Sequence, residues 1–277
     1  KKNTNKKQTQ LEMQRKLELS FSDHKKLKKK CDYYRIKYLT SIFDTKSLKY
    51  LKKLNVKTVK IPSGEINNVL LLRHISTSKL KIILSTGMST KNEISNAIRI
   101  LTKGGIKKRN ITLLQCNSEY PTPFEDVNLN VMKNFEKTFK VKVGISDHTL
   151  GIEVPVAAAA MGAKVIEKHF TINRNLRGPD HKASLTPRQL REMVKSIRNI
   201  EKALGKKNKA VTNSEKKNVK IARKSLVASK KIDKGEKFTS ENLSIKRPGT
   251  GIPADRYFKV LGKISKKNYL KDQLIKL

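Results

Sequence analysis

The sequence predicts an α/β fold: a (β/α)8 barrel of the TIM type in which two strands cannot be located, followed by a small β-rich domain. Short runs of apolar and β-branched residues alternate with helical patterns at intervals of roughly 20 to 30 residues, the size of one βα unit. A polar cluster follows nearly every run. No glycine-rich turn follows the first run, although a doubly wound nucleotide-binding sheet would need one there. The barrel is therefore favoured over the open sheet.

Six runs are predicted to be strands of this barrel. They span Tyr38–Phe43, Thr58–Pro62, Lys81–Ser85, Ile111–Cys116, Val141–Ile145 and Lys164–Lys168. The polar clusters at their ends are SIFD, SGE, STGM, QCNSEYPTP, SDHT and KHF. Because the carboxyl ends of parallel barrel strands open on one face, these clusters predict a functional site on that face.

Capping signals and apolar spacing predict the helices. The opening segment, from Leu11 to about Tyr34, is predicted to form one helix. Thr90 and Glu93 have the spacing of a capping box, and Thr186 followed by Pro187 is typical of a helix start. Helices at these places fit the alternation that a barrel requires.

The composition changes after Gly205. The next stretch is polar and carries no strong apolar stripe, whereas the rest of the chain contains short strand-like pieces broken by turns. We therefore divide the chain into a partial barrel over residues 1–204, a linker over 205–222 and a small domain over 223–277.

The chain has a formal net charge of +40. Its lysines are spread over the whole length and aromatic residues make up only 5%, unlike the clustered arginines and stacking aromatics of nucleic-acid readers. We interpret the charge as a lysine-biased surface and expect neither a nucleic-acid nor a membrane partner. No apolar run is long enough to span a bilayer, and the two cysteines, Cys31 and Cys116, are far apart. These features favour a cytoplasmic location.

Two of the five histidines follow predicted strands. His148 and His169 would point into the same barrel mouth, where two neutral imidazoles can bind a divalent metal that keeps open positions for water or substrate. The alternative is a pair of hydrogen-bonded histidines without metal. His24 and His74 fall on predicted helices and are interpreted as surface or packing residues, and His181 is a weaker candidate ligand.

The same face predicts an anion site. Ser63, Ser85 and Ser146 supply hydroxyl groups at strand ends, where neighbouring glycines allow close backbone approach. Lys60 lies between apolar strand neighbours and could supply a charge to a phosphate or carboxylate; the alternative is one more surface lysine. Glu65 is a candidate general acid or base, with simple compensation of a helix dipole as the alternative.

Six motifs resemble the sialic acid synthase family, the N-acetylneuraminate synthases that include the legionaminate synthases. They are KIPSGEINN, IILSTGMST, LLQCNSEYPTPFEDVNL, GISDHTLG, AAAAMGAKVIEKHF and RGPDHKASLTP. The tail ARKSLVASKKIDKGEKFTSENLSIKRPGTGI is similar to the antifreeze-like (SAF, β-clip) domain that ends these enzymes. The resemblance covers nearly the whole chain in family order.

The resemblance implies an activity and a site. Members condense phosphoenolpyruvate with an N-acetylated amino sugar, either N-acetylmannosamine or a diacetamido-dideoxy relative, to give a nonulosonic acid and phosphate. They are domain-swapped homodimers that use a divalent metal, typically Mn²⁺, with Mg²⁺ or Co²⁺ as alternatives. The matching motifs imply His148 and His169 as metal ligands; Ser41, Lys60, Ser63, Ser85, Ser118 and Ser146 as phosphoenolpyruvate-binding residues; Glu65 as the catalytic acid or base; and Tyr120, Asp180 and Arg247 as sugar-binding residues, the arginine acting in the other subunit's site.

The sequence departs from the family pattern in two places. Ile42 stands where members have proline, which affects the shape of one loop. Members also begin with two strands, carrying Glu-Ile-Gly-x-Asn-His and Lys-x-Gln motifs, that this sequence lacks. A barrel without its first two strands has open edges and lacks one substrate-binding lysine. We therefore expect residues 1–277 alone to be poorly stable and weakly active or inactive. Adding the upstream residues and measuring phosphate release tests this, and full activity without them would contradict it.

Two other functions are compatible with parts of the sequence. A truncated, inactive paralogue could act as a basic binding protein, although such a relic would have no need to keep the site residues together. A related barrel enzyme could make a deoxy-octulosonate phosphate, but the antifreeze-like domain argues against it. The motifs leave the identity of the amino sugar open.

Overall fold

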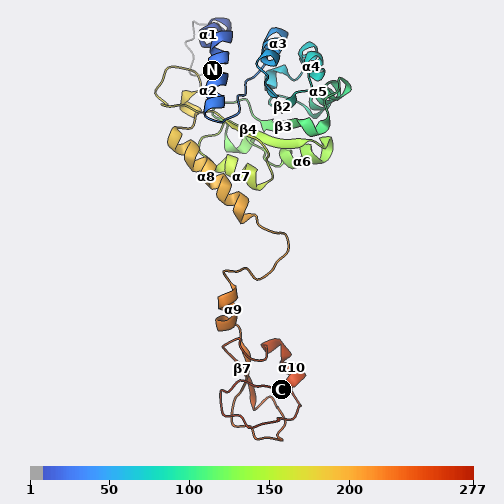
Figure 1. Cartoon of the computed structure of the whole chain (residues 1–277), viewed down its shortest axis with the longest axis vertical. Coiled ribbons are helices and arrows are strands. Elements are labelled where there is room, and N and C mark those ends of the chain that lie inside the picture. Colours follow the sequence, from blue (N-terminus) through green and yellow to red (C-terminus); the bar gives the residue numbers. More distant parts are fainter. Residues whose placement is uncertain (1–8) are drawn as a thin grey trace. The chain divides into compact units, whose positions relative to one another are not determined.

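The computed structural model describes residues 9–277. The chain forms two compact units, the first ending at Gly205 and the second running from Lys206 to Leu277 (Figure 1). Among the described residues, no helix has the length and apolar character needed to cross a membrane.

The first unit is built on a five-stranded parallel sheet whose strands follow the order of the chain. The strands are β1 (Thr58–Ile61), β2 (Lys81–Ser85), β3 (Ile111–Cys116), β4 (Lys142–Asp147) and β5 (Ile166–Lys168). A helix follows each strand, as the alternating pattern predicts, and the curled sheet is an arc of a (β/α)8 barrel. The ends of β1, β4 and β5 differ from the predicted bounds by one or two residues.

The strand predicted over Tyr38–Phe43 is reduced to a single parallel bridge between Ser41 and Lys60. Ile42 N donates to the Lys60 carbonyl, and Lys60 N donates to the Thr40 carbonyl. Among the described residues, this segment pairs with β1 on one side and with no strand on the other. Few hydrogen bonds therefore hold it in an extended form, which explains why the strand is so short.

Helices cover one face of the five-stranded sheet (Figure 1). They are α3 (Thr45–Lys53), which precedes β1, and then α4 (Val69–Ser76), α5 (Lys91–Lys103), α6 (Val131–Phe139), α7 (Glu153–Ala160) and α8 (Pro187–Ala203). The predicted capping box of Thr90 and Glu93 starts α5. Thr186 caps α8 and Pro187 lies in its first turn, as predicted.

The single helix predicted from Leu11 to about Tyr34 is in fact two helices, α1 (Gln10–Leu17) and α2 (Phe21–Tyr33). Ser20 marks the break, because its side chain accepts a hydrogen bond from Asp23 N and caps α2. Apolar residues continue through the break, so spacing alone predicts one uninterrupted helix.

The core of the first unit lies between the sheet and its covering helices. Alternate strand residues, among them Val59, Leu84 and Val143, are buried there with apolar residues of α3 to α7. The intervening strand residues point to the opposite, inner face, because successive side chains of a strand alternate. In a barrel, the functional groups lie where this inner face meets the carboxyl ends of the strands.

The sheet curves strongly toward its inner face. β1 and β5 lie at opposite edges of the sheet, yet Lys60 Nζ of β1 lies 3.0 Å from Glu167 Oε1 of β5. The two edge strands of a flat five-stranded sheet would be far too distant for this contact, because neighbouring strands are about 4.8 Å apart. Gly144 allows close packing of β4 on β5, since a Cβ there would lie 2.1 Å from the Val165 carbonyl oxygen.

The second unit has a core of its own. Its sheet is the antiparallel pair β6 (Ser225–Ala228) and β7 (Leu243–Lys246), and isolated bridges take the place of the other predicted strand-like pieces. A short helix, α10 (Tyr257–Val260), adds to the unit. The buried apolar side chains come from both strands and from the turns; they are Leu226, Ala228, Ile232, Phe238, Leu243, Val260, Tyr269 and Ile275.

The segment predicted as a linker, 205–222, contains a helix, α9 (Lys216–Ala222). This helix has no buried residue, and its Ile221 is 68% exposed. Gly249 N donates to the Lys220 carbonyl and ties the helix to the second unit. The prediction missed α9 because a helix without an apolar stripe gives no periodic signal in the sequence.

Candidate active site

The ends of the strands bring predicted polar residues together on the inner face. The strand register pairs Cys116 with Ser146, and Ser146 with Glu167. Directly paired residues of parallel strands point to the same side, so these three side chains form a row. His148 and His169 lie two residues further along β4 and β5, on the same side.

Lys60 places a buried cation in this row. The residue is only 6% exposed, and its ammonium forms the ion pair with Glu167. Ser146 Oγ donates to the same carboxylate oxygen at 2.7 Å. The three groups form a compact cluster in which Glu167 compensates the buried charge. An anion bound here would compete with Glu167 for Lys60.

Ser63, Gly87 and Cys116 extend the cluster. Gly87 N donates to Ser63 Oγ at 2.9 Å, and Ser63 Oγ lies 3.7 Å from Cys116 Sγ. A Cβ on Gly87 would come within 2.9 Å of Ser63 Oγ, so a larger residue would displace the Ser63 hydroxyl from this position. Burial raises the pKa of the Cys116 thiol, which therefore stays protonated at neutral pH.

Ser85, at the end of β2, contributes a hydroxyl group that is free to bind. The residue is 1% exposed, and its Oγ forms no hydrogen bond with any described residue. Leaving a buried polar group unpaired is unfavourable by about 1–3 kcal/mol, so such groups normally have a partner. The Ser85 hydroxyl is therefore available to a polar ligand.

The two histidines and Tyr120 form a second cluster. The ring centroids of His148 and His169 are 5.3 Å apart. Tyr120 lies against both rings, with centroid distances of 3.9 Å to His148 and 5.2 Å to His169. Burial raises the pKa of Tyr120, so its phenol is neutral. The prediction that both histidines reach the same mouth is confirmed.

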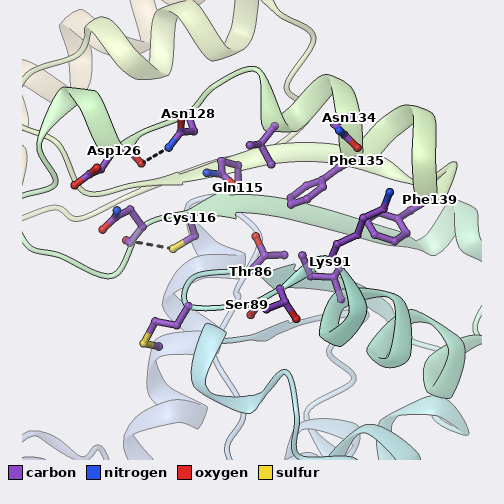
Figure 2. A pocket seen from close by; sticks show the side chains of 15 residues that line it. Thr86, Ser89, Lys91, Gln115, Cys116, Asp126, Asn128, Asn134, Phe135 and Phe139 are labelled. Atoms are coloured by element: carbon purple, nitrogen blue, oxygen red, sulfur yellow. Dashed lines mark hydrogen bonds between the residues drawn. The ribbon is translucent and has the colours of Figure 1, made fainter.

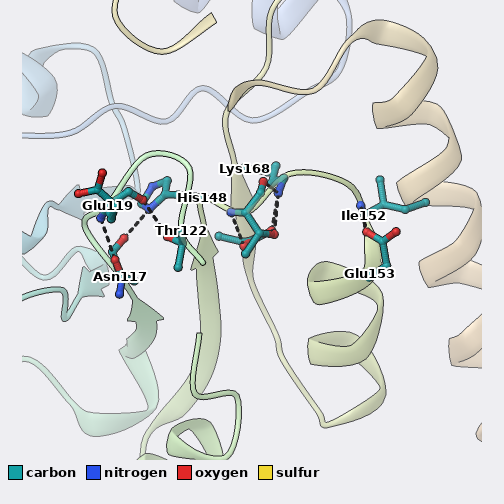
Figure 3. A network of polar contacts seen from close by, with 9 residues as sticks. Asn117, Glu119, Thr122, His148, Ile152, Glu153 and Lys168 are labelled. Carbon is teal, nitrogen blue, oxygen red and sulfur yellow. Dashed lines mark hydrogen bonds and ion pairs between the residues drawn. The ribbon is translucent and has the colours of Figure 1, made fainter. Parts of the chain in front are cut away.

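His148 is held in one orientation by its neighbours (Figure 3). Its Nδ1 lies 2.6 Å from the Asn117 carbonyl oxygen, and its own carbonyl accepts a hydrogen bond from Thr122 N. Because a carbonyl only accepts, Nδ1 carries the proton and Nε2 carries the lone pair. Burial lowers the pKa of His148, so the ring is neutral at pH 7. A neutral histidine that donates its second ring nitrogen to a carbonyl is the usual form of a metal ligand.

The donor set fits a divalent cation with two protein ligands. Among residues 9–277, no group of three or more His, Cys, Asp and Glu side chains gathers as a complete metal site would. A cation between His148 and His169 would therefore complete its coordination with oxygen atoms of substrate or water. Asp180 lies beside this pair, with its Oδ2 4.0 Å from His169 Nδ1.

Two predicted residues flank the cluster around Lys60. Glu65 is half-buried in the turn that follows β1, where Asn68 Nδ2 donates to its carboxylate at 2.6 Å. Ser41 bridges to Lys60 through the backbone and lies at the adjacent edge of the sheet.

Three other candidate residues have different surroundings. Ser118 is exposed, one residue beyond Asn117 in the loop after β3. Arg247 belongs to the second unit, where its Nε donates to the Ala222 carbonyl at 3.0 Å. His181 Nδ1 is bonded to Thr171 Oγ1 at 2.8 Å, which gives it a role in the loop structure.

A cavity lies beside the clusters rather than at them. It has a volume of about 560 Å³ and opens between α5 and α6 (Figure 2). Gln115, Asn128 and Phe135 line it, together with Cys116 and further residues, but neither histidine nor Ser85 does. Its polar groups are mostly satisfied within the protein; the Gln115 side chain, for example, donates to the Val127 carbonyl. We therefore place the candidate active site on the inner face.

Glu167, Asp147 and Lys168 are not among the residues that the sequence predicts for the site. Glu167 stands two residues before His169, and the period of two along a strand would have placed it on the same face. Asp147 and Lys168 belong to the SDHT and KHF clusters, but their side chains point to the face opposite the histidines, so the expected site on the inner face does not include them.

Comparisons with known proteins identify the family. The NeuB family matches residues 1–209 and the SAF domain matches residues 223–277. The N,N'-diacetyllegionaminic acid synthase of Campylobacter jejuni is 51% identical over 97% of this chain and 80% of its own length. The corresponding synthase of Legionella pneumophila is 41% identical over 92% of this chain and 72% of its own length.

A solved structure extends the comparison to the fold. The N-acetylneuraminic acid synthetase of Leptospira borgpetersenii, crystallised with citrate, matches with a TM-score of 0.69 and 33% identity over 75% of this chain and 72% of its own. The matches to these synthases agree with the resemblance of the six motifs and the tail. The chain thus belongs to the NeuB family and carries a C-terminal SAF domain.

Proposed function

We propose that the protein condenses phosphoenolpyruvate with an N-acetylated amino sugar, forming a nonulosonic acid and phosphate. The observation that carries this proposal is that one concave face holds a buried lysine, an unpaired buried hydroxyl and two adjacent imidazoles. An anion site beside a metal site is what this condensation needs. The 51% identity to the Campylobacter synthase favours a diacetamido-dideoxy sugar over N-acetylmannosamine as acceptor.

Phosphoenolpyruvate would be held through its two anionic groups. Lys60 supplies the charge, and the hydroxyl groups of Ser63, Ser85 and Ser146 donate hydrogen bonds. These donors lie on fixed strand ends, so they need little reorganisation when negative charge develops. Ser41 and Ser118 are proposed as outer contacts to the same substrate.

The metal would be held by His148 and His169. A mixed set of imidazole nitrogens and oxygen ligands suits Mn²⁺ or Co²⁺ better than Mg²⁺, which prefers oxygen ligands alone, and we propose Mn²⁺. When bound, the cation supplies Lewis-acid polarisation of the open-chain sugar aldehyde.

The bonds change in a defined order. Carbon 3 of phosphoenolpyruvate bonds to the aldehyde carbon, and water adds to carbon 2 with loss of one proton. The bond between carbon 2 and the phosphate oxygen then breaks while the new hydroxyl group gives its proton to the phosphate, which leaves a ketone. The aldehyde oxygen gains a proton, and we propose Glu65 as the acid or base that moves it. Tyr120 and Asp180, beside the histidines, are proposed to face the sugar. By the family resemblance, we also propose a domain-swapped homodimer in which Arg247 of the partner subunit binds the N-acetyl end of the sugar.

A phosphate-release assay tests the proposal. The protein in its full natural length is incubated with phosphoenolpyruvate and either N-acetylmannosamine or a 2,4-diacetamido-dideoxy hexose, with and without Mn²⁺. We expect release only with a sugar present, a higher kcat/KM for the diacetamido sugar, and loss of activity on chelation. Release that chelation leaves unchanged would contradict the metal assignment, and no release with either sugar would contradict the function.

Glu167→Gln is expected to lower stability and to tighten anion binding. Without the carboxylate, Lys60 is a buried cation with no charge partner, which is unfavourable by about 3–5 kcal/mol in the ligand-free protein. An anion that restores the pairing recovers part of this energy, and recovery of about 1.4 kcal/mol corresponds to tenfold tighter binding. Calorimetric titration with phosphate and a thermal melt measure both effects. Glu192→Gln, at an exposed helix pair, is the control, and unchanged phosphate affinity in Glu167→Gln would contradict the expectation.

A further inference from the structure

A buried ion pair ties together the two strands that carry the histidines, and the proposed reaction makes no use of it. Lys168 Nζ contacts Asp147 Oδ2, and the two side chains are 3% and 1% exposed. Asp147 immediately precedes His148, and Lys168 immediately precedes His169. Asp147 and Lys168 are also direct register partners of β4 and β5.

Thr149 closes the same network on the other side of His148. Its N donates to Asp147 Oδ1 at 3.0 Å, and its Oγ1 donates to Asp147 Oδ2 at 3.1 Å. Lys168 Nζ also donates to the Thr149 carbonyl. His148 is therefore flanked by two residues that contact one lysine. Figure 3 shows Lys168 in these contacts and His148 in its own contact with Asn117.

The ion pair and the histidines lie on opposite faces of the two strands. Side chains alternate along a strand, so Asp147 and Lys168 point away from the face to which His148 and His169 point. Locking the register partners Asp147 and Lys168 fixes the distance between the backbones of the two following residues. The imidazoles, with centroids 5.3 Å apart, extend from those residues.

Stability alone does not account for such a pair. A buried ion pair is often no more stabilising than an apolar pair of similar volume, because both charges lose their hydration. Its contribution is fixed geometry: a lysine and a carboxylate with defined hydrogen bonds allow one arrangement of the two strand ends. A fixed arrangement of strand ends matters most where two side chains must converge on one point.

We propose that Lys168, Asp147 and Thr149 form a positioning device that sets the separation and orientation of the His148 and His169 imidazoles. Through them it determines how tightly a divalent cation is held. The part that concerns the cation rests on the proposed function, whereas the part that concerns the histidine geometry does not.

The test uses the double variant Asp147→Asn/Lys168→Met in the protein of full natural length. The double variant leaves no uncompensated buried charge, and asparagine can keep the hydrogen bond to Thr149 N, so the change removes the link between the strands. Lys164→Met, at the exposed start of the segment that leads into β5, is the matched control. Calorimetric titration is expected to give a Kd for Mn²⁺ about 10–100-fold weaker in the double variant, with Tm near that of the parent and an unchanged Kd in the control.

A second readout needs no metal. A strand end that is free to shift no longer holds His148 Nδ1 against the Asn117 carbonyl, and this contact fixes the tautomer. Nitrogen-15 NMR of the metal-free protein is therefore expected to show His148 as a single Nδ1–H tautomer in the parent and as a mixture of tautomers in the double variant. A double variant with the parental Kd and the parental tautomer would overturn the proposal, whatever its Tm. If the parent binds no Mn²⁺, the metal assignment of the proposed function fails, and the tautomer of His148 alone decides the positioning role.

Discussion

Lys60→Met is expected to lower kcat/KM for phosphoenolpyruvate by about 10²–10³-fold, the loss seen when one preorganised donor to a developing anion is removed. Lys60 is the buried cation of the inner face, and at 6% exposure water cannot replace it. Methionine keeps most of the side-chain volume, so the change removes the charge and leaves the packing. Steady-state phosphate release at varied phosphoenolpyruvate measures the effect.

Two further variants distinguish the effect of losing the Lys60 charge from an effect on folding. Lys57→Met changes an exposed lysine one residue before β1 and is expected to leave kcat/KM unchanged. Lys60→Met/Glu167→Gln removes both partners of the ion pair, so that no unpaired carboxylate remains in the site. The double variant should keep its Tm and still show the lowered kcat/KM of Lys60→Met. Parental kcat/KM in Lys60→Met would exclude the lysine from substrate binding.

His148→Gln is expected to weaken Mn²⁺ binding by more than the roughly 10–100-fold that loss of an outer-shell partner causes. The imidazole would be one of two protein ligands, so its removal leaves His169 as the single side-chain donor among the described residues. Glutamine retains a polar group of similar length but gives a much poorer metal ligand. Calorimetric titration with Mn²⁺ and phosphate release at saturating metal should both show the loss.

The control for this variant is His74→Gln. His74 is exposed on α4, and its Nδ1 lies 2.8 Å from the Leu70 carbonyl oxygen of the same helix. Its replacement should alter neither metal affinity nor activity. A His148→Gln protein that binds Mn²⁺ with parental affinity would show that the metal, if used, lies elsewhere.

Most of the barrel arc could be predicted from the sequence because buried parallel strands are short apolar runs at regular intervals. β2 and β3 begin and end at the predicted residues. The helix cap at Thr90 could also be predicted, because a threonine and a glutamate three residues apart can each accept a hydrogen bond from the other's backbone N–H group. Convergence of His148 and His169 followed from one rule, that parallel strand ends open on one face.

The predictions that differ from the structure concern interactions that local sequence patterns do not encode. The strand predicted over Tyr38–Phe43 shares only the Ser41–Lys60 bridge with β1, and among the described residues it has no strand on its other side. The break at Ser20 depends on a capping bond, which competes with the apolar spacing around it. The ion pair of Lys60 with Glu167 joins the two edge strands of the sheet. These strands come close only because the sheet curves, and the sequence pattern does not give that curvature.

The most direct test of the central claim, that one concave face holds both an anion site and a metal site, is a crystal structure of the full-length protein soaked with Mn²⁺ and phosphoenolpyruvate. We predict an anomalous manganese peak bound by the imidazoles of His148 and His169, with phosphoenolpyruvate in contact with Lys60 Nζ and Ser85 Oγ. Manganese or phosphoenolpyruvate bound away from these residues would contradict the account.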